Sequence, residues 1–112
     1  PNEYFEAKEF DKALTAFKAI QKKDSLNPII RERTINSLGY RYIRKNDFDS
    51  ALAIFKINVE LHPKSSNVFN SLGEAYFLKK DTINAIESFK KSLSINPENR
   101  NSKRFLKKIT KK

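Results

Sequence analysis

Residues that commonly carry catalysis or hold metals are sparse in this sequence. His62 is the only histidine and stands next to Pro63, and the chain has no cysteine that could act as a nucleophile or share a metal with it. The carboxylates of Asp47, Asp49 and Glu60 fall on expected turns and outer helix faces without paired spacing. The only two glycines lie inside expected helices, so the sequence offers no glycine-rich phosphate loop. We therefore expect a protein without catalysis of its own, without a cofactor and without a metal.

The segments that would position any site occur in two copies, 34 residues apart in the sequence. A repeat of this length predicts a stacked-helix array in which each unit buries its apolar face against its neighbours. Six identical pairs carry the repeat: Leu38, Gly39, Tyr42, Ala51, Phe55 and Pro63 recur as Leu72, Gly73, Tyr76, Ala85, Phe89 and Pro97.

An incomplete third copy precedes these two. Tyr4 and Phe17 match Tyr42 and Phe55 at an offset of 38 residues, so four extra residues fall in the connection at about 24–31. Since Pro28 can open a helix, we expect the next helix to gain about one turn. We expect residues 2–7 to be the end of an earlier helix.

Further helices are expected over about 48–61, from after Ser65-Ser66 to Lys80-Asp81, from there to before Asn96-Pro97, and over 99–110. Gly39 and Gly73 sit inside these helices, where glycine costs about 1 kcal/mol relative to alanine. We expect them to allow close approach of a facing helix at Ala51 or Ala85, with large aromatic residues filling the flanking space.

The positive charge is concentrated at the C-terminal end. Of a formal net charge of +10, residues 98–112 contribute seven Lys or Arg against one Glu. We therefore expect the last helix to be a basic cap with a polar outer face. Nucleic-acid binding through this tail is a minor alternative, because the basic residues ring the cap without forming a stripe across the repeats. The longest apolar run, 51–55, is far short of the roughly 20 residues that span a membrane, and the compartment stays open between cytoplasm and periplasm.

The series Leu-Gly-x-x-Tyr, with Ala nine positions on, Phe four after that and Pro eight further, resembles the tetratricopeptide repeat. The resemblance divides the chain into a partial repeat at 1–27, a repeat at 28–65 with an extended first helix, a repeat at 66–99 and a basic capping helix at 100–112. Ile35 and Phe69 stand where the family usually has Trp, and Asn58 and Ser92 where it usually has a small residue. The resemblance implies an all-α fold: a right-handed superhelix of antiparallel helix pairs with a C-terminal capping helix.

The resemblance also implies a concave face, lined by the first helix of each unit, that receives peptides or partner helices. Some family members clamp the C-terminal carboxylate of a chaperone there, but Tyr40 and Glu74 hold the corresponding places, and Glu74 would repel a carboxylate. Tyr40 and Phe77 are the candidate aromatic anchors, unless they pack against neighbouring helices. Carried onto this sequence, the face comprises Arg33, Asn36, Tyr40, Ile43, Arg44, Asn67, Asn70, Glu74 and Phe77.

Two functions are compatible with these features. The first is a non-catalytic protein-interaction or assembly scaffold. The second follows from a narrower resemblance: the run 69–76, with 94–99 and the Lys-rich helix, is similar to the repeat tail of some bacterial serine hydrolases of the esterase or β-lactamase-like kind. The lack of a starting Met fits such a tail, which would position or dimerise the enzyme. Half a repeat at the N-terminus leaves an apolar face along Phe10, Leu14 and Phe17, open to self-association.

Overall fold

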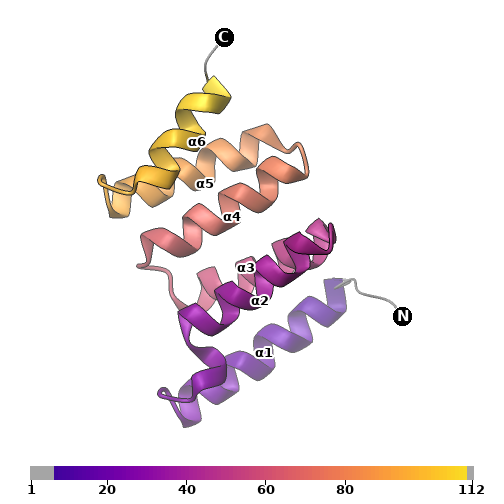
Figure 1. The fold of residues 1–112 in the computed structure, drawn as a ribbon. Helices are drawn as coiled ribbons and strands as arrows, with labels where there is room; N and C mark the ends of the chain where they lie inside the picture. The colour runs from indigo at the N-terminus through magenta and orange to yellow at the C-terminus, as the bar shows by residue number, and fades with distance from the viewer. Residues whose placement is uncertain (1–6, 111–112) are drawn as a thin grey trace.

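The computed structural model describes residues 7–110, which form six α-helices and one 3-10 turn and contain no strand (Figure 1). The all-α fold expected from the sequence is confirmed. Residues 2–6, expected to end an earlier helix, lie outside the described part, and α1 already begins at Ala7. Within that part, no helix is both long and apolar enough to cross a membrane. The elements are α1 (Ala7–Lys23), η1 (Pro28–Ile30), α2 (Glu32–Arg44), α3 (Phe48–Leu61), α4 (Ser66–Leu78), α5 (Thr82–Ile95) and α6 (Arg100–Thr110).

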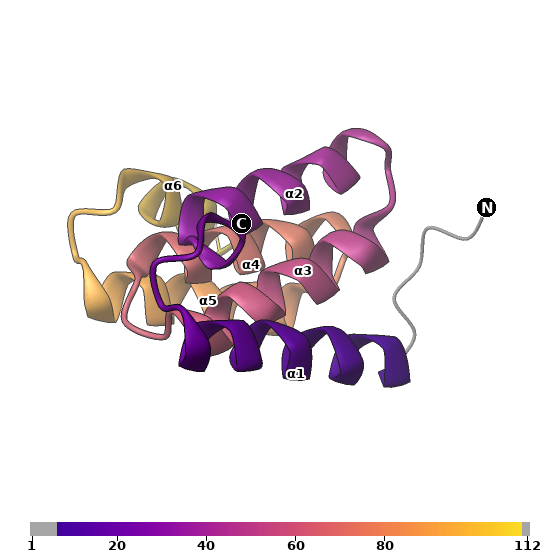
Figure 2. The ribbon, with the colours of Figure 1, turned by 90° about the horizontal axis from the view of Figure 1, so that it is seen from below.

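The helices stack in two layers. In one layer α2 contacts α4 and α4 contacts α6, and in the other α1 contacts α3. Figure 2 shows α2 and α6 along one side of the stack and α1 along the opposite side. The strongest pairings join α2 to α3 and α4 to α5, which are the two helix pairs of the repeat. The binding face expected from the sequence lies on α2 and α4 of the α2–α4–α6 layer.

The same local device separates the two helices of each pair. Asn46 and Lys80, 34 residues apart, adopt left-handed backbone with φ of 62° and 65°. This conformation ends α2 and α4 and directs the chain into the next helix. Asp47 and Asp81 follow, and each accepts a hydrogen bond from the backbone N–H three residues on, at 3.1 and 3.3 Å. These N-caps start α3 and α5 at the expected places.

The mid-helix glycines allow two helices to pack closely, but not against alanine as expected. A methyl group at Gly39 would overlap the ring of Phe55, and one at Gly73 would lie 2.7 Å from Cε1 of Phe89. Both phenylalanine rings are fully buried. Each glycine therefore leaves a space that the facing phenylalanine ring occupies. The ring fills this space more completely than the methyl group of an alanine could.

The four extra residues before α2 do not lengthen that helix. Pro28 opens the separate turn η1, which Asn27 caps by accepting a hydrogen bond from Ile29 N at 3.0 Å. Arg31 then has extended backbone, with φ of −65° and ψ of 141°, and α2 begins only at Glu32. The insertion thus forms a turn that buries Ile30 in the core beside α1 and α2.

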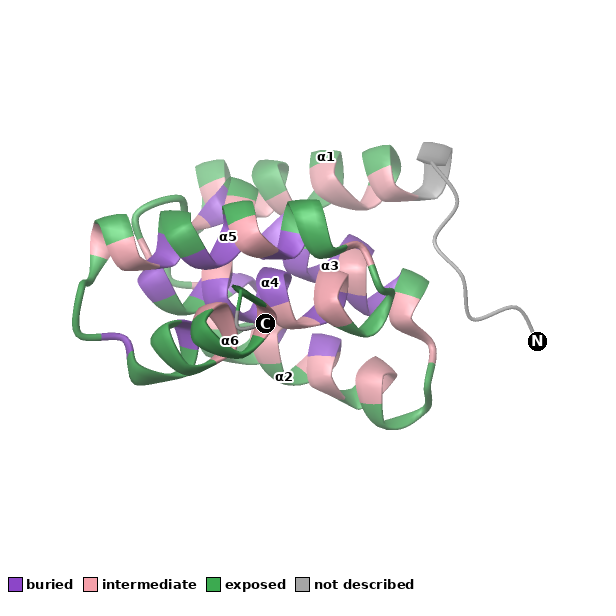
Figure 3. Cartoon of the chain, turned by 90° about the horizontal axis from the view of Figure 1, so that it is seen from above, coloured by how far each residue is buried: buried purple, intermediate pink, exposed green. Residues whose placement is uncertain are grey.

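The N-terminal helix is less covered than its counterparts. Five of its apolar side chains pack against the core cluster of Ile30, Ile35, Ile54, Ile57 and Leu61; they are Phe10, Ala13, Leu14, Phe17 and Ile20. Even so, all of them are only partly buried, whereas α3 and α5 each have a fully buried band (Figure 3). Phe17 is half-buried, while Phe55 and Phe89 at the matching positions are 0% exposed. The apolar side of α1, which faces this cluster, is therefore only partly covered.

Candidate functional site

A hollow of about 510 Å³ lies on the α2–α4–α6 face, and we refer to it as the groove hollow. Five of the nine residues expected on the binding face line it, and they come from both α2 and α4. The first turn of α6 adds a wall that the sequence interpretation had not included. The lining residues are Glu32, Arg33, Asn36, Tyr40, Asn67, Asn70, Ser71 and Asn101.

Four expected residues lie outside this lining. Ile43 is half-buried and packs on the core cluster formed by Ala51, Phe55, Leu72 and Ala75, while Arg44 is exposed in the last turn of α2. Glu74 sits beside the hollow and accepts hydrogen bonds from two of its lining residues, Tyr40 and Asn70. Phe77 packs edge-on against Phe105 of α6, with ring centroids 5.6 Å apart. The hollow thus brings together five hydrogen-bonding residues of the expected face, while two charged residues, Arg44 and Glu74, and two apolar ones, Ile43 and Phe77, lie outside its lining.

Tyr40 is both a lining residue and a packing residue. Its ring meets Phe55 edge-on, with centroids 5.2 Å apart and planes at 65°. Its hydroxyl donates a hydrogen bond of 2.9 Å to Glu74 Oε2 and lies 3.3 Å from Ser71 Oγ. Because Tyr40 and Glu74 occupy the same position in successive repeats, this bond joins α2 directly to α4. Tyr40 is therefore held in one orientation at the edge of the hollow.

Burial governs the charge state of this pair. Burial raises the pKa of Glu74, although the hydrogen bonds donated by Tyr40 and Asn70 and the positive charge of Arg104 act to lower it. Burial also raises the pKa of Tyr40, and the Glu74 carboxylate adds to that rise. The phenol thus stays protonated and acts as a donor to Glu74. Both protein donors bond to the same carboxylate oxygen, Oε2, and hold the group in place beside the hollow.

A chain of polar side chains continues from Glu74 into the capping helix. Asn70 Nδ2 donates to Glu74 at 3.1 Å, and Ser102 Oγ donates to Asn70 Oδ1 at 2.9 Å. Ser102 and Ser66 both bond to Ser92, at 2.7 and 2.8 Å. Buried polar groups that find partners in this way fix the relative position of their helices. This polar chain holds α4, α5 and α6 in one arrangement around the hollow.

The sequence interpretation did not include the polar chain or Asn101. The sequence held one signal for the polar chain: Ser92, a residue with a hydroxyl group, stands where the repeat family usually has another small residue. The signal for Asn101 was the 34-residue offset itself, which carries Arg33 to Asn67 and then to Asn101. Following that offset into the capping helix would have extended the expected face by one more helix.

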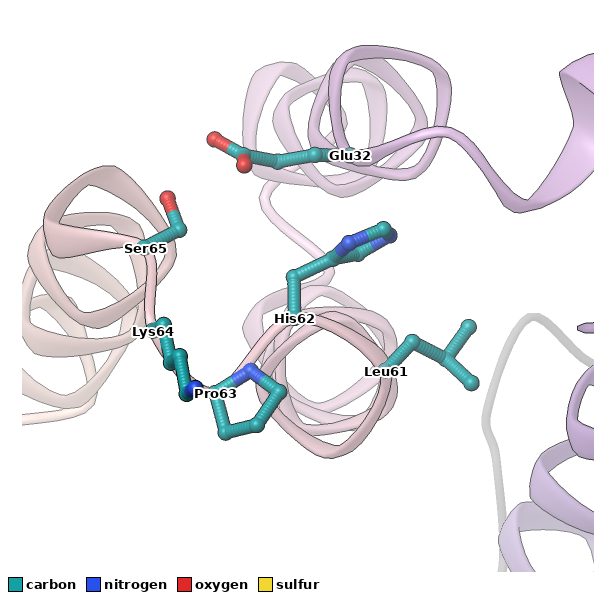
Figure 4. Close-up of a pocket in the computed structure, with 6 residues that line it drawn as sticks. All are labelled: Glu32, Leu61, His62, Pro63, Lys64 and Ser65. Atoms are coloured by element: carbon teal, nitrogen blue, oxygen red, sulfur yellow. The ribbon is translucent and has the colours of Figure 1, made fainter. Parts of the chain in front are cut away.

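A second hollow, of about 440 Å³, lies at the connection between α3 and α4 (Figure 4). Its one candidate for chemistry, His62, has Nε2 2.8 Å from the carbonyl oxygen of Ile30. The imidazole therefore holds η1 against the end of α3, which is a structural role. Within residues 7–110, no group of three or more acidic or histidine side chains is arranged to hold a metal ion.

Comparisons with known proteins identify the repeat. Residues 66–99 match the sequence model of the tetratricopeptide repeat, so α4 and α5 form one such unit. A search of curated proteins found no match to this chain.

Solved structures with this fold match 90% or more of the chain. The crystal structure of MamA is similar with a TM-score of 0.64 and 25% identity, over 90% of this chain and 57% of that chain. The present chain thus spans less than two thirds of MamA. The first tetratricopeptide-repeat domain of human RPAP3 is similar with a TM-score of 0.68 and 22% identity, over 97% of this chain and 83% of that one. The first such domain of Spaghetti (RPAP3), bound to an HSP90 peptide, gives the same TM-score at 20% identity and the same coverage.

Proposed function

We propose that this chain, whose residues 66–99 form a tetratricopeptide repeat, is a non-catalytic protein-interaction scaffold. It holds a peptide segment or a partner helix at the groove hollow of the α2–α4–α6 face. The observation that carries the proposal is the convergence of Arg33, Asn36, Tyr40, Asn67 and Asn70 on one hollow. These residues come from α2 and α4, and the resemblance to the tetratricopeptide repeat places all of them on the expected binding face.

The order of the hollow before binding supports the proposal. The bond between Tyr40 and Glu74 and the polar chain through Ser102 hold side chains that would otherwise lose rotamer freedom on binding. Binding to a surface that is already ordered loses less conformational entropy, so more of the interaction free energy contributes to affinity. RPAP3, which shares the fold, is bound to a peptide in one of its structures. A small rigid hollow with polar walls suits the same kind of ligand.

Selection from a random peptide library tests the proposal for any peptide partner. Peptides are enriched on the wild-type chain and then measured against two variants of exposed residues. Asn67→Arg fills the groove hollow, whereas Lys90→Ala alters an exposed residue of α5, outside the binding layer. We expect the selected peptides to lose at least tenfold in affinity for Asn67→Arg and to keep their affinity for Lys90→Ala. Equal binding to Asn67→Arg and the wild type would contradict the proposal.

A second candidate function rests on the partial cover of α1. Phe17 is half-buried where its counterparts are fully buried, so a further protein surface would gain free energy by packing there. An accessory domain that positions or dimerises an enzyme would use such a face. Sedimentation equilibrium at high protein concentration tests the dimer: a chain that remains strictly monomeric excludes dimerisation through α1.

A further inference from the structure

We propose that Ser102 of the capping helix is a positioning residue for the groove hollow and thereby determines part of its specificity. Ser102 is fully buried and is not among the residues that line the hollow. It acts through Asn70, which lines the hollow. The inference rests on the proposed function where it concerns peptides, whereas the effect of Ser102 on the hollow itself can be measured without any ligand.

The side-chain amide of Asn70 is held at both ends. Its Nδ2 donates to Glu74 Oε2 at 3.1 Å, and its Oδ1 accepts from Ser102 Oγ at 2.9 Å. Asn70 is only 5% exposed, so losing either partner leaves a buried polar atom without a hydrogen bond. The second Nδ2 hydrogen has no acceptor among the described residues. Because Asn70 lines the hollow, this hydrogen is the donor that its amide can offer to a peptide.

Ser102 is itself fixed from two further sides. Its Oγ lies 2.7 Å from Ser92 Oγ in α5, and its backbone N–H donates to Asn99 Oδ1 at 3.2 Å. A side chain with partners on two other helices has little rotamer freedom. Ser102 therefore offers Asn70 a hydroxyl at a fixed place.

The position of Asn70 affects a second helix. Glu74 Oε2 accepts from Asn70 and also from the hydroxyl of Tyr40, at 2.9 Å. If Asn70 moves, Glu74 keeps only the Tyr40 donor among the described side chains, and the carboxylate is free to turn about that bond. Since Tyr40 lines the hollow as well, one hydroxyl in α6 influences lining residues in both α4 and α2.

This arrangement occurs at the junction with the cap and not at the junction between the two repeats. At the 34-residue offset, Asn70 corresponds to Asn36 and Ser102 corresponds to Val68. Val68 is 1% exposed and has no hydroxyl, so Asn36 instead accepts a hydrogen bond from Ser71 at 2.7 Å. An apolar residue at this position is thus sufficient for one helix to stack on the next. The serine is not required for stacking, which points to the placement of Asn70 as its role.

Nuclear magnetic resonance of the ligand-free chain tests the positioning. In Ser102→Ala we expect the side-chain NH₂ signals of Asn70 to shift and their nuclear Overhauser contacts with the Glu74 side chain to weaken. Ser50→Ala is the matched control, because Ser50 is equally buried and its hydroxyl bonds to Asp47 in the first turn of α3, outside the lining of the hollow. The control should leave the Asn70 signals in place. Unchanged Asn70 signals in Ser102→Ala would overturn the proposal.

A third variant keeps the test decisive if Ser102→Ala folds poorly. Ser102→Cys nearly preserves the shape of the side chain but replaces the hydroxyl by a weak donor. We expect it to shift the Asn70 signals in the same direction as Ser102→Ala. Circular dichroism checks that each variant is folded at the temperature of the measurement.

Fluorescence anisotropy with labelled library-selected peptides tests the consequence for recognition. We expect Ser102→Ala to weaken their binding about fivefold, as the loss of one hydrogen bond would. Ser50→Ala should leave the affinity unchanged. A second selection, carried out on the Ser102→Ala chain, should enrich peptides that differ from those selected on the wild type.

A double-mutant cycle in binding separates positioning from a general loosening of the cap. If Ser102 acts through Asn70, then Ser102→Ala has no further effect on affinity in an Asn70→Ala background. Additive effects of the two substitutions would show that Ser102 contributes to stability alone, and would overturn the inference.

The outcomes distinguish this inference from the proposed function. If selected peptides bind at the hollow and Ser102→Ala binds them as the wild type does, the inference is wrong and the proposed function stands. If the library yields no peptide, the proposed function fails, and the ligand-free spectra still decide whether Ser102 positions Asn70.

Discussion

The hydroxyl of Tyr40 donates a 2.9 Å hydrogen bond to the carboxylate of Glu74, the residue at the same position of the next repeat. This contact joins α2 to α4 at the edge of the groove hollow. One side chain thus supplies packing on one side, through its ring against Phe55, and a fixed polar wall on the other. The binding face and the core share this residue, so its substitution affects both stability and recognition.

Tyr40 variants should separate these two contributions. Tyr40→Phe removes the hydroxyl and leaves half-buried Glu74 with one donor fewer, which we expect to lower the free energy of unfolding by about 1–2 kcal/mol. Tyr40→Ala also removes the ring from Phe55 and should cost about 3 kcal/mol or more. Urea denaturation measures both. A Tyr40→Ala chain as stable as the wild type would show that the ring serves binding alone.

Glu74 should make the stability depend on pH. Its pKa is raised on folding, so its favourable contribution is present in acid and is lost as the pH rises through the folded-state pKa. At neutral pH the ionised carboxylate of Glu74 therefore lowers the free energy of unfolding relative to a neutral group. Glu74→Gln keeps an oxygen acceptor for Tyr40 and Asn70 without the charge.

We expect Glu74→Gln to raise the melting temperature at pH 7 by a small amount. The difference from the wild type should shrink as the pH falls through the raised folded-state pKa toward 4.5, the ordinary pKa of the group, and should change little below it. Thermal unfolding followed by circular dichroism at several pH values measures this. A variant that is less stable than the wild type at pH 7 would show that the attraction to Arg104 outweighs burial.

Gly39 and Phe55 should be coupled. Gly39→Ala would by itself favour the helix by about 1 kcal/mol, but the added methyl group overlaps the buried ring of Phe55. Since overpacking costs about 1–3 kcal/mol, we expect a net loss of stability. In a Phe55→Leu background the same change should be neutral or stabilising. A double-mutant cycle measures the coupling, and additive effects would contradict the close contact.

Lys80 and Asn46 offer a reciprocal pair at the left-handed turns. Asparagine tolerates positive φ better than lysine does, because its short polar side chain bonds locally. We expect Lys80→Asn to stabilise the chain by about 0.5–1 kcal/mol and Asn46→Lys to destabilise it by a similar amount. Chemical denaturation of the two variants provides the measurement. Changes of the same sign in both would refute the role given to backbone strain.

Much of the fold could be predicted because the repeat carries redundant information. Leu38, Gly39 and Phe55 recur at a fixed offset, and so do the Asp residues at the turns. These repeated residues predict which segments are helical and about where most of the helices begin and end. The turn η1 could not be predicted, since Asn27-Pro28 suits both an α-helix and a 3-10 turn, and the outcome lies in the extended backbone of Arg31.

The candidate site was predictable in part. The resemblance to the tetratricopeptide repeat assigns Arg33, Asn36 and Asn67 to one face, but it does not show which polar groups already have partners. The polar chain depends on Ser66, Ser92 and Ser102, which come from three different helices. Serine carries little helical or hydrophobic signal, so such a network emerges only when the helices are packed. The same packing gives Phe77 a partner in Phe105.

Amide chemical-shift mapping on the isotope-labelled chain, titrated with a library-selected peptide, tests the central claim most directly. Binding at the groove hollow predicts shifts in α2, α4 and the first turn of α6, together with movement of the side-chain NH₂ signals of Asn67 and Asn101. Residues of α1 and the exposed side of α5 should stay unchanged. Shifts confined to α1, α3 or α5 would contradict the account, because the bound peptide would then lie on the other layer.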